Sequence, residues 1–444
     1  MKKIIFFILI ISTILLLNSC ISKPKDGSLL KNKLIYGNFD KELIFSENIS
    51  KITIDGQTII NQDKNNRIII SKDFFKNSDN SIKIKYETIY GRIYEENIPI
   101  IHPDLQIFFY AGGETSGGSL GNFIPNDIQE MKDGIIKSSK IISINIVADY
   151  NDSPDKIISI NNVNGLISQT INFPQEYGLD EELKVSDPET LNFFMDELID
   201  KNNSSKLFMI LWNHGSGWIG EGTKRYHYLN NNYSSKSIII EDNANYLRIN
   251  ELKNLLYLFN SKYNKIPDII GFDACNMSMI EIIYELSDYT DYLVSSVNLI
   301  PGTGWNYKFL SKYDDNIDVL LQNLVQYYKE TYENKDNIPY KTSLTALKTN
   351  GLKLELDNFF KNYVSSSSDK EFKTYYTFGN YNSIKNTDIN QTGFKIEDYI
   401  LSSYVEDNPN LSGIGLALKV PSSYKEDYEA LTFYKNKLWN PVFE

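Results

Sequence analysis

Two side chains in this 444-residue chain have the types needed for nucleophilic attack on a carbonyl group. His214, one of only three histidines, follows the apolar run "LFMILW", and Cys275 closely follows the apolar run "IIGF". A thiol attacks as its thiolate, and a neighbouring imidazole can take the thiol proton and later return it. The two residues together predict a cysteine nucleophile served by a histidine.

The neighbours of these two residues supply the rest of such a site. Cys275 precedes the segment "NMSMIEIIYEL", so we expect it at the N-terminus of a helix, where the helix dipole favours a thiolate. Gly215 has no side chain to block its N–H group, which can hold a developing oxyanion together with the N–H of Cys275. The alternative interpretation is that His214 is a structural histidine and Cys275 a small buried hydrophobic residue.

Both residues stand at the ends of predicted strands. From position 105 onward, continuous apolar runs of strand length alternate with helical segments; the runs are "LQIFFYAGG", "IISINIVAD", "KLFMILWNHG", "PDIIGFDAC" and "DYLVSSV". Such runs are typical of strands buried on both faces of a parallel sheet, so we expect an α/β fold with a mostly parallel sheet sandwiched by helices. A right-handed crossover makes successive strands neighbours, which brings His214 and Cys275 to the carboxyl edge where α/β proteins bind ligands.

The sequence also predicts helices between these strands. The segment "DPETLNFFMDELI" predicts a helix with Asp187 as its N-cap and Pro188 at its first position. The segment "NELKNLLYLFN" repeats this spacing and places four apolar residues on one helical face: Leu252, Leu255, Leu256 and Phe259. Both helices are therefore expected to cover the sheet.

The chain before this region predicts a separate all-β unit. Asp55 and Gly56 stand between alternating apolar residues, which is a hairpin signal, and "SIKIKYETIY" alternates with a period of two. We therefore expect a small sandwich-like domain at 33–103, serving as a spacer or docking module, in front of an α/β domain at 104–444.

The first residues predict export and a lipid anchor. Residues 1–20 contain two lysines, a short apolar run and small or polar residues that end at Cys20, which resembles the signal of a bacterial lipoprotein acylated on that cysteine. Residues 21–32 are polar and suit a tether. The predicted location is the cell envelope, on a membrane and facing the periplasm or the exterior; the alternatives are an ordinary signal peptide and an N-terminal membrane anchor.

Composition narrows the possible partners. A net charge of −12 argues against nucleic acid, which needs clustered lysine and arginine. Only Cys20 and Cys275 are present, so a lipid on Cys20 leaves Cys275 without a disulfide partner. A lone thiol in an exported chain is either buried or reactive.

Two further motifs are weaker indications of a binding site. The loop "AGGETSGGSLGN" lacks both the lysine of a phosphate loop and dinucleotide spacing, so we interpret it as a strand-to-helix connection. The acidic segment 149–156 could offer oxygens to calcium but lacks the ordered spacing of a calcium loop, and we expect a solvated turn there. The residues alone predict no metal site and require no cofactor.

Several motifs together resemble one family. The stretches "ILWNHGSGW" and "IIGFDACNMSMIEIIYEL" closely resemble the clostripain family of cysteine peptidases, in which His-Gly and Ala-Cys pairs carry the catalytic dyad. Further landmarks in the same order are "DPETLNFFMDEL", "IIIEDNANYLRINEL", "PGTGWNY" and "SGIGLALKVP". The resemblance covers about residues 105–444 and implies a caspase-like fold, with His214 and Cys275 as the dyad, Gly215 and Cys275 as oxyanion donors, and calcium as a compatible cofactor.

The resemblance also bears on the substrate, which it implies to be a protein or peptide. Relatives of clostripain cleave after arginine or lysine, and the acid two residues before the catalytic cysteine, here Asp273, is associated with that preference. Bidentate pairing of a buried carboxylate with arginine is a sound physical basis for it. The segment "SSVNLIPGTGWNY" has no acid, and Asn298 and Thr303 stand where more negative charge is expected, so the preference rests on Asp273 with Thr303 beside it. The alternative for Asp273 is a structural role as an N-cap or as a partner of a backbone amide.

The resulting prediction is a lipid-anchored cysteine endopeptidase outside the cytoplasm. Self-cleavage in the polar segment 221–237, which contains Lys224, Arg225 and Lys236, is a further hypothesis. The competing prediction is a catalytically weak or inactive surface lipoprotein that uses the peptidase fold and the β-domain for binding.

Overall fold

The computed structural model describes most of the chain between Leu29 and Phe443. Outside the described residues lie 1–28, 31–34, 37–40, 55, 72–73, 75–80, 116–119, 152, 202–204, 219–237, 241–244, 334, 336–337, 367–395, 407–411, 418, 421 and 444. The predicted signal, Cys20 and the predicted processing segment 221–237 therefore fall outside the description. No helix among the described residues is long and apolar enough to cross a membrane. The chain divides into two compact units, Met1–His102 and Pro103–Glu444.

The first unit is built of strands, as the alternating pattern predicts. Its strands are β1 (Ile35–Tyr36), β2 (Lys41–Ile44), β3 (Ile49–Ile54), β4 (Gln57–Ile60), β5 (Arg67–Ile70), β6 (Ser81–Thr88) and β7 (Ile93–Ile101). Five of them form a sheet in the order β1-β7-β6-β3-β4, and β2 pairs with β5. The hairpin between β3 and β4 turns at Gly56, whose φ of +80° suits glycine.

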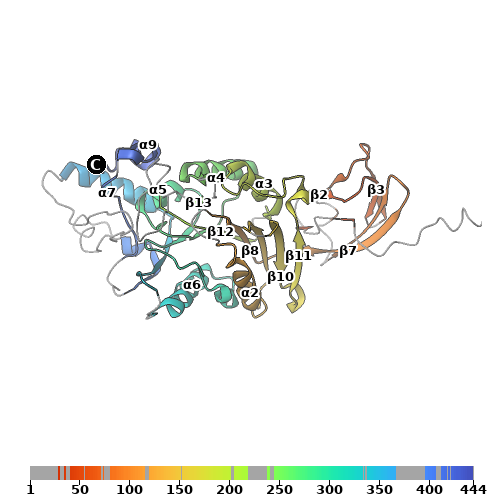
Figure 1. The fold of residues 1–444 in the computed structure, drawn as a ribbon, viewed down its shortest axis with the longest axis horizontal. Helices are drawn as coiled ribbons and strands as arrows, with labels where there is room; N and C mark the ends of the chain where they lie inside the picture. Colours follow the sequence, from red (N-terminus) through yellow and green to blue (C-terminus); the bar gives the residue numbers. More distant parts are fainter. Residues whose placement is uncertain are drawn as a thin grey trace, which may run out of the picture. The chain divides into compact units, whose positions relative to one another are not determined.

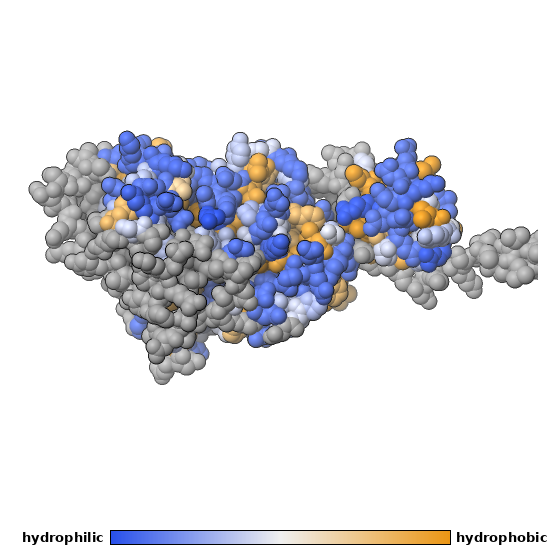
Figure 2. Space-filling view, turned by 45° about the horizontal axis from the view of Figure 1, so that its top comes forward, coloured by the Kyte–Doolittle hydropathy of each residue, from blue (hydrophilic) through white to orange (hydrophobic). Residues whose placement is uncertain are grey.

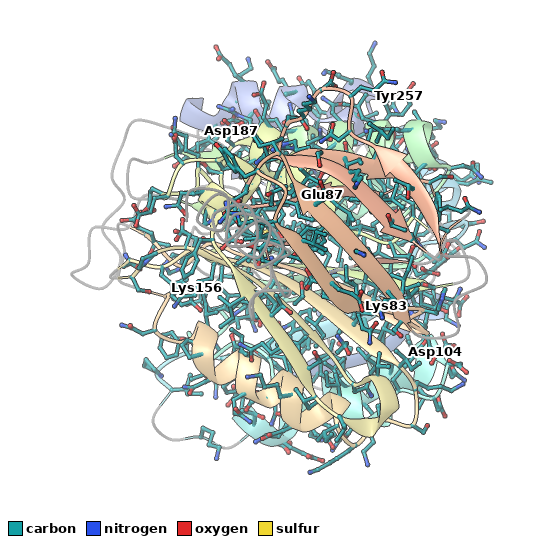
Figure 3. The ribbon with its side chains drawn as sticks, turned by 90° about the vertical axis from the view of Figure 1, so that its right-hand side faces the viewer. Lys83, Glu87, Asp104, Lys156, Asp187 and Tyr257 are labelled. Atoms are coloured by element: carbon teal, nitrogen blue, oxygen red, sulfur yellow. The ribbon has the colours of Figure 1, made fainter. Side chains whose placement is uncertain are left out.

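Alternation along β6 gives this unit its core and its surface. Ile82, Ile84 and Tyr86 are buried in one apolar cluster with residues of the other strands. Lys83 and Glu87 lie on the opposite face of β6 (Figure 3), where Glu87 pairs with Lys51. Side chains with a period of two thus make one face of the sheet apolar and leave the other to solvent.

The second unit contains one large sheet. It has the strand order β11-β10-β9-β8-β12-β15-β16-β17-β18. The strands are β8 (Leu105–Ala111), β9 (Ile142–Ala148), β10 (Lys156–Asn161), β11 (Ser168–Asn172), β12 (Lys206–Trp212), β15 (Ile269–Asp273), β16 (Tyr292–Ser295), β17 (Ser343–Lys348) and β18 (Ile400–Val405). The five central strands from β9 to β16 are mutually parallel, and the pairs at both sides are antiparallel. The apolar runs thus form the parallel core of the sheet, as predicted.

Helices cover both faces of this sheet (Figure 1). The α-helices are α2 (Ile124–Ile135), α3 (Pro188–Leu198), α4 (Ile249–Tyr263), α5 (Ile280–Leu286), α6 (Ile317–Tyr332), α7 (Leu352–Ser366), α9 (Lys425–Ala430) and α10 (Thr432–Lys435). Short 3-10 helices are Val163–Gly165, Pro174–Tyr177, Tyr307–Lys312, Ile396–Asp398 and Ser422–Tyr424, and the two small sheets are β13 (Ile238–Ile240) with β14 (Tyr246–Leu247) and β19 (Lys419–Val420) with β20 (Val442–Phe443). Helices α3, α4 and α5 lie on one side, and α2 and α6 on the other (Figure 1).

The helix signals in the sequence are confirmed. Asp187 accepts a hydrogen bond from the backbone N–H of Glu189, and Pro188 is the first residue of α3. The apolar residues that the spacing places on one face of each helix, such as Leu191 on α3 and Leu252 on α4, are buried. Tyr257 on α4 and Ile60 on β4 are exposed apolar residues. On the face shown in Figure 2, hydrophobic residues form small separate patches among hydrophilic ones, which is ordinary for a folded surface.

Candidate active site

The strands β12 and β15 bring His214 and Cys275 to the same edge of the sheet. They are parallel neighbours, and Trp212 at the end of β12 pairs with Asp273 at the end of β15. His214 and Cys275 each lie two residues beyond that pair. The crossover argument therefore places both residues correctly at the carboxyl edge.

Gly215 packs against the backbone of Cys275. A Cβ atom at Gly215 would lie 2.3 Å from the carbonyl oxygen of Cys275 and 3.1 Å from its backbone nitrogen. Contacts that short are not available to any other residue, so the approach of the two segments requires glycine. The backbone N–H of Gly215 also acts on the Cys275 thiol and lowers its pKa.

The thiol of Cys275 is surrounded by backbone groups. The N–H of Ile300 donates to Sγ at 3.2 Å, and Sγ lies 3.7 Å from the carbonyl oxygen of Ile300. Burial nevertheless raises the pKa of the Cys275 thiol to about 11, against the lowering effect of the Ile300, Cys275 and Gly215 N–H groups. The resting group is therefore a neutral thiol at neutral pH.

The prediction that Cys275 sits at a helix N-terminus is wrong. Helix α5 begins only at Ile280, with Met279 at its N-cap. Between them the chain makes a turn in which Asn276 has a φ of +61°, a left-handed conformation that asparagine tolerates. The helix dipole falls off within the first turn, so it does not act on this thiol.

His214 also rests in its neutral form. The residue is partly exposed, but its Nε2 atom is shielded from solvent. Burial lowers the pKa of His214 to about 4, because the imidazolium loses its hydration. A neutral imidazole can accept the proton of a thiol, which is what general-base catalysis requires.

Asp273 lies beneath this edge in the apolar core. It is only 3% exposed, and its Oδ2 accepts hydrogen bonds from the backbone N–H of Trp305 at 2.8 Å and from the hydroxyl of Tyr307 at 2.7 Å. Its Oδ1 is buried with no hydrogen-bond partner among the described residues. Burial raises the pKa of Asp273 to about 7. The carboxylate thus does bind a backbone amide, and it keeps one oxygen for another group.

Asp127 is a second buried acid that the sequence analysis missed. It lies on α2, is 2% exposed, and accepts a hydrogen bond from the side chain of Trp212. Its Oδ2 has no hydrogen-bond partner within the described part of the chain. Burial first, and then the charge of Asp273, raise the pKa of Asp127 to about 10. The signal was available, because Asp127 lies on the helical face of Ile124, Ile128 and Met131, where an apolar residue is normal.

Other polar atoms gather around Asp273. The Nε1 of Trp305 and the hydroxyl of Tyr328 are buried and have no hydrogen-bond partner among the residues described. Burial first, and then the charges of Tyr332, Asp273 and Cys275, raise the pKa of Tyr328, which lies in this region. Buried polar atoms without partners are rare and costly in a native protein, which indicates that this region receives a polar group.

Thr303 and Asn298 have more local roles. The hydroxyl of Thr303 is hydrogen-bonded to the hydroxyl of Tyr332 at 2.7 Å, and Tyr332 also donates to the carbonyl oxygen of Gly304. The carbonyl of Asn298 accepts from the N–H of Asn276 at 3.0 Å. Thr303 therefore holds the segment above Asp273, and Asn298 holds the turn after the thiol.

The prediction of a solvated turn at 149–156 is wrong. Asp149 is 1% exposed, and Asp155 is fully buried, with its two oxygens accepting the N–H groups of Tyr150 and Leu183. Burial first, and then the charges of Asp155, Glu182 and Glu114, raise the pKa of Asp149 to about 8. This acidic segment is part of the folded edge of the sheet.

The fold and this edge define a caspase-like α/β protein. A sequence model of the clostripain family matches residues 109–395. A secreted C11 cysteine protease from Bacteroides thetaiotaomicron, solved with an irreversible peptide inhibitor, is 16% identical; the match covers 76% of this chain and 100% of that chain, with a TM-score of 0.58. An inactive zymogen C11 protease from Parabacteroides distasonis is 17% identical, with 78% and 100% covered and a TM-score of 0.54. A search of curated proteins gives no match.

The chain belongs to the clostripain family, and it is a cysteine peptidase. The first unit, up to His102, lies outside the matched residues.

Proposed function

We propose that the protein is an endopeptidase in which Cys275 is the nucleophile and His214 is its general base and acid. The observation that carries this proposal is the close packing of Gly215 against the backbone of Cys275, which holds the His214 segment beside the thiol. Cys275 is also the one cysteine within the family match. A peptidase of this class needs a thiol, and this chain offers one in the matched region.

The proposed reaction begins from the neutral pair. As the Sγ–carbon bond forms, the thiol proton moves to His214 and the carbonyl electron pair moves to the oxygen. The N–H groups of Gly215 and Cys275, which already act on Sγ, lie where they can bind that oxyanion. The carbon–nitrogen bond then breaks, His214 protonates the leaving amine, and a thioester remains. Water, deprotonated by His214, hydrolyses the thioester and restores the thiol.

We infer a preference for arginine or lysine on the acyl side of the cleaved bond. Asp273 and Asp127 place two carboxyl groups in the core below the thiol, and each has an oxygen without a partner among the described residues. A guanidinium or ammonium group could donate hydrogen bonds to both oxygens and pair with the charge of Asp273. Asp127 thus supplies the second acid that the segment 295–307 lacks.

We further propose that the mature protein is held at the cell envelope by a lipid on Cys20 and faces the periplasm or the exterior. The support is the arrangement of residues 1–20, with basic residues, an apolar run and a cysteine. Labelling growing cells with an alkyne fatty acid would tag the wild-type protein and leave a Cys20→Ala variant untagged. Equal labelling of both proteins would contradict the anchor.

The activity itself is tested with fluorogenic peptides that differ only in the residue before the cleaved bond. We expect turnover of lysine and arginine peptides by the wild-type protein and none by Cys275→Ala. His214→Ala should retain less than about 1% of the turnover, in keeping with the contribution of a general base. A folded wild-type protein that neither turns over any peptide nor reacts with a thiol-directed probe would favour the surface binding protein instead.

A further inference from the structure

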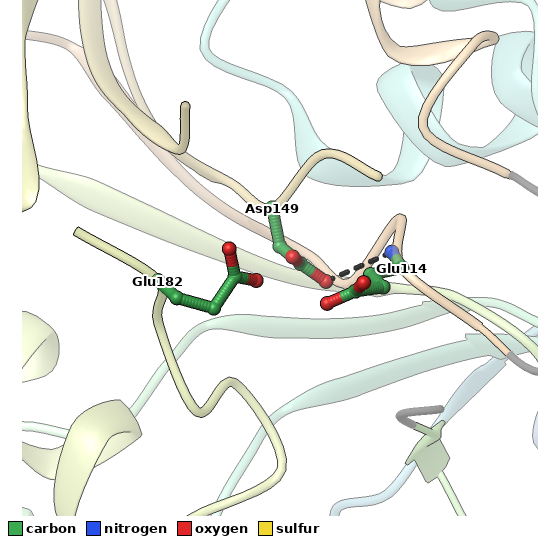
Figure 4. A group of neighbouring side chains, drawn as sticks. All are labelled: Glu114, Asp149 and Glu182. Atoms are coloured by element: carbon green, nitrogen blue, oxygen red, sulfur yellow. Dashed lines mark hydrogen bonds between the residues drawn. The ribbon is translucent and has the colours of Figure 1, made fainter. Parts of the chain in front are cut away.

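Three carboxylates meet at the carboxyl edge of the sheet, near the ends of β8 and β9, which are the second and third strands from β15. Glu114 follows β8, Asp149 follows β9, and Glu182 lies in the segment before α3. One oxygen atom from each lies within 4.8 Å of the other two. Figure 4 shows the three side chains pointing toward one another, with Asp149 between the two glutamates. We call Glu114, Asp149 and Glu182 the edge acids.

Asp149 is built into this group and still offers an oxygen to it. Its Oδ2 accepts the backbone N–H of Glu114 at 3.0 Å, which fixes the direction of the side chain. Its Oδ1 is buried and receives no hydrogen bond from an N–H or O–H donor among the described residues, although the side chain lies close enough to Asp155 for the two carboxyl groups to share a proton. Burial first, and then the charges of Asp155, Glu182 and Glu114, oppose ionisation of Asp149. A cation between the edge acids would offset these effects and favour the carboxylate.

We propose that the edge acids bind one divalent cation, and that the ion is calcium. Calcium binds carboxylate oxygens at about 2.3–2.6 Å, so two of its ligands can be up to about 5 Å apart. The three oxygens meet that condition as they stand. Glu182 is exposed, which leaves room for the water molecules that complete the six to eight ligands of calcium. Magnesium needs shorter bonds and a nearly ideal octahedron, which three acids on separate segments supply poorly.

The ion would join three segments next to the strand that carries His214. The N–H of Gly112, two residues before Glu114, donates to the carbonyl of Trp212 at 3.1 Å, and the side chain of Asn213 donates to the carbonyl of Gly112. Asp155 already links the segment after β9 to Leu183, beside Glu182. Calcium would thus stabilise the support of His214 without touching the reacting atoms.

Calcium binding is measured on the purified full-length protein after treatment with a chelator. Isothermal titration calorimetry should show one calcium per chain, and magnesium should bind at least tenfold more weakly. Asp149→Asn should weaken calcium binding at least about 100-fold, because it removes the central charge while its oxygen still accepts the N–H of Glu114. Glu182→Gln, at an exposed position, should weaken it at least about tenfold. Glu181→Gln removes an equal charge from the neighbouring residue and should leave the affinity within twofold.

Thermal unfolding gives a second readout that needs no turnover, so it is independent of the proposed function. Calcium should raise the melting temperature of the wild-type and Glu181→Gln proteins and leave that of Asp149→Asn unchanged. Without calcium, Asp149→Asn should be at least as stable as the wild type, because like charges repel less. Absence of calcium binding by the wild type, or equal binding by Asp149→Asn, would overturn the site. A wild-type protein without calcium that is more stable than Asp149→Asn and insensitive to the ion would show that Asp149 and Asp155 only share a proton.

Discussion

Two acidic groups of the α/β unit differ in their surroundings. The edge acids come from three loops; Asp149 accepts the backbone N–H of Glu114, and Glu182 is exposed to solvent. Asp127 and Asp273, which we call the core acids, lie among aromatic rings, including Trp212 and Tyr307. The edge acids therefore suit a hydrated ion with several oxygen ligands, and the core acids suit a single organic cation carried on a long apolar stem.

Position in the sheet separates the two groups in function as well. The core acids lie below the end of the strand pair that leads to the proposed dyad, so we expect them to act on the substrate. Glu114 and Asp149 follow β8 and β9, and Glu182 lies before α3, so we expect the edge acids to act only on the support of that pair. The comparison predicts that changes in the core acids alter which peptide is cleaved, whereas changes in the edge acids alter stability.

The largest effect is expected from Asp273→Asn. The amide keeps an oxygen for the N–H of Trp305 and the hydroxyl of Tyr307, but it removes the charge that pairs with a basic residue. We expect kcat/KM for lysine and arginine peptides to fall about 100-fold, equivalent to about 2.7 kcal/mol. Hydrolysis of peptides with an apolar residue at that position should change little. An equal loss on both peptide classes would assign Asp273 a structural role only.

The pH dependence of kcat/KM tests the same carboxyl group. Burial raises the pKa of Asp273 to about 7, so the group is neutral below this pH and charged above it. The pKa of His214 is lowered to about 4 and that of Cys275 raised to about 11, so neither group titrates in this window. Between pH 6 and 8, kcat/KM for basic peptides should rise about tenfold.

The control for this profile is Asp273→Asn with the same peptides, which should give a nearly flat curve. A rise of equal size in that variant would mean that another group titrates.

Asp127→Asn should have a smaller effect. Asp127 keeps its proton in the empty site because its pKa is raised to about 10, and an amide imitates that neutral form. A bound basic side chain pairs with Asp127 only after Asp127 loses its proton. The free energy of that deprotonation reduces the net gain from the ion pair. We expect kcat/KM for lysine peptides to fall roughly fivefold, or about 1 kcal/mol, with unchanged melting temperature.

The matched control is Asp133→Asn, which removes a half-exposed acid from the same helix. It should leave kcat/KM within twofold of the wild type. If Asp127→Asn behaves in the same way, Asp127 belongs to the core packing and not to the substrate site.

The parts of the site that could be predicted from sequence are those fixed by the strands. The apolar run before His214 and the one before Cys275 predict buried parallel strands, and a crossover through α4 makes them neighbours. The start of α5 was not predicted, because "NMSM" continues the apolar helical pattern while the turn at Asn276 depends on tertiary contacts.

The acidic residues were predicted less well for a related reason. Charge favours solvent, so the segment containing Asp149 and Asp155 was assigned to a turn, whereas the folded loops bury both residues. Asp127 was overlooked because its neighbour Asp273 is 146 positions away, and only the sheet brings them together. Local patterns predict elements, but burial of a charge depends on which distant segments cover it.

The smallest expected effect comes from Asp149→Asn on substrate choice. Glu114 and Asp149 follow β8 and β9, and Glu182 precedes α3, so none of the edge acids lies on the strand pair that leads to His214 and Cys275. The ratio of kcat/KM for lysine and leucine peptides should therefore change less than twofold. The absolute rate can fall as the support of His214 loosens, but it should fall equally for both peptides. This ratio separates the two acidic groups: Asp273→Asn must change it strongly and Asp149→Asn must not. A large change in the ratio for Asp149→Asn would indicate that the edge acids and the core acids belong to one substrate site.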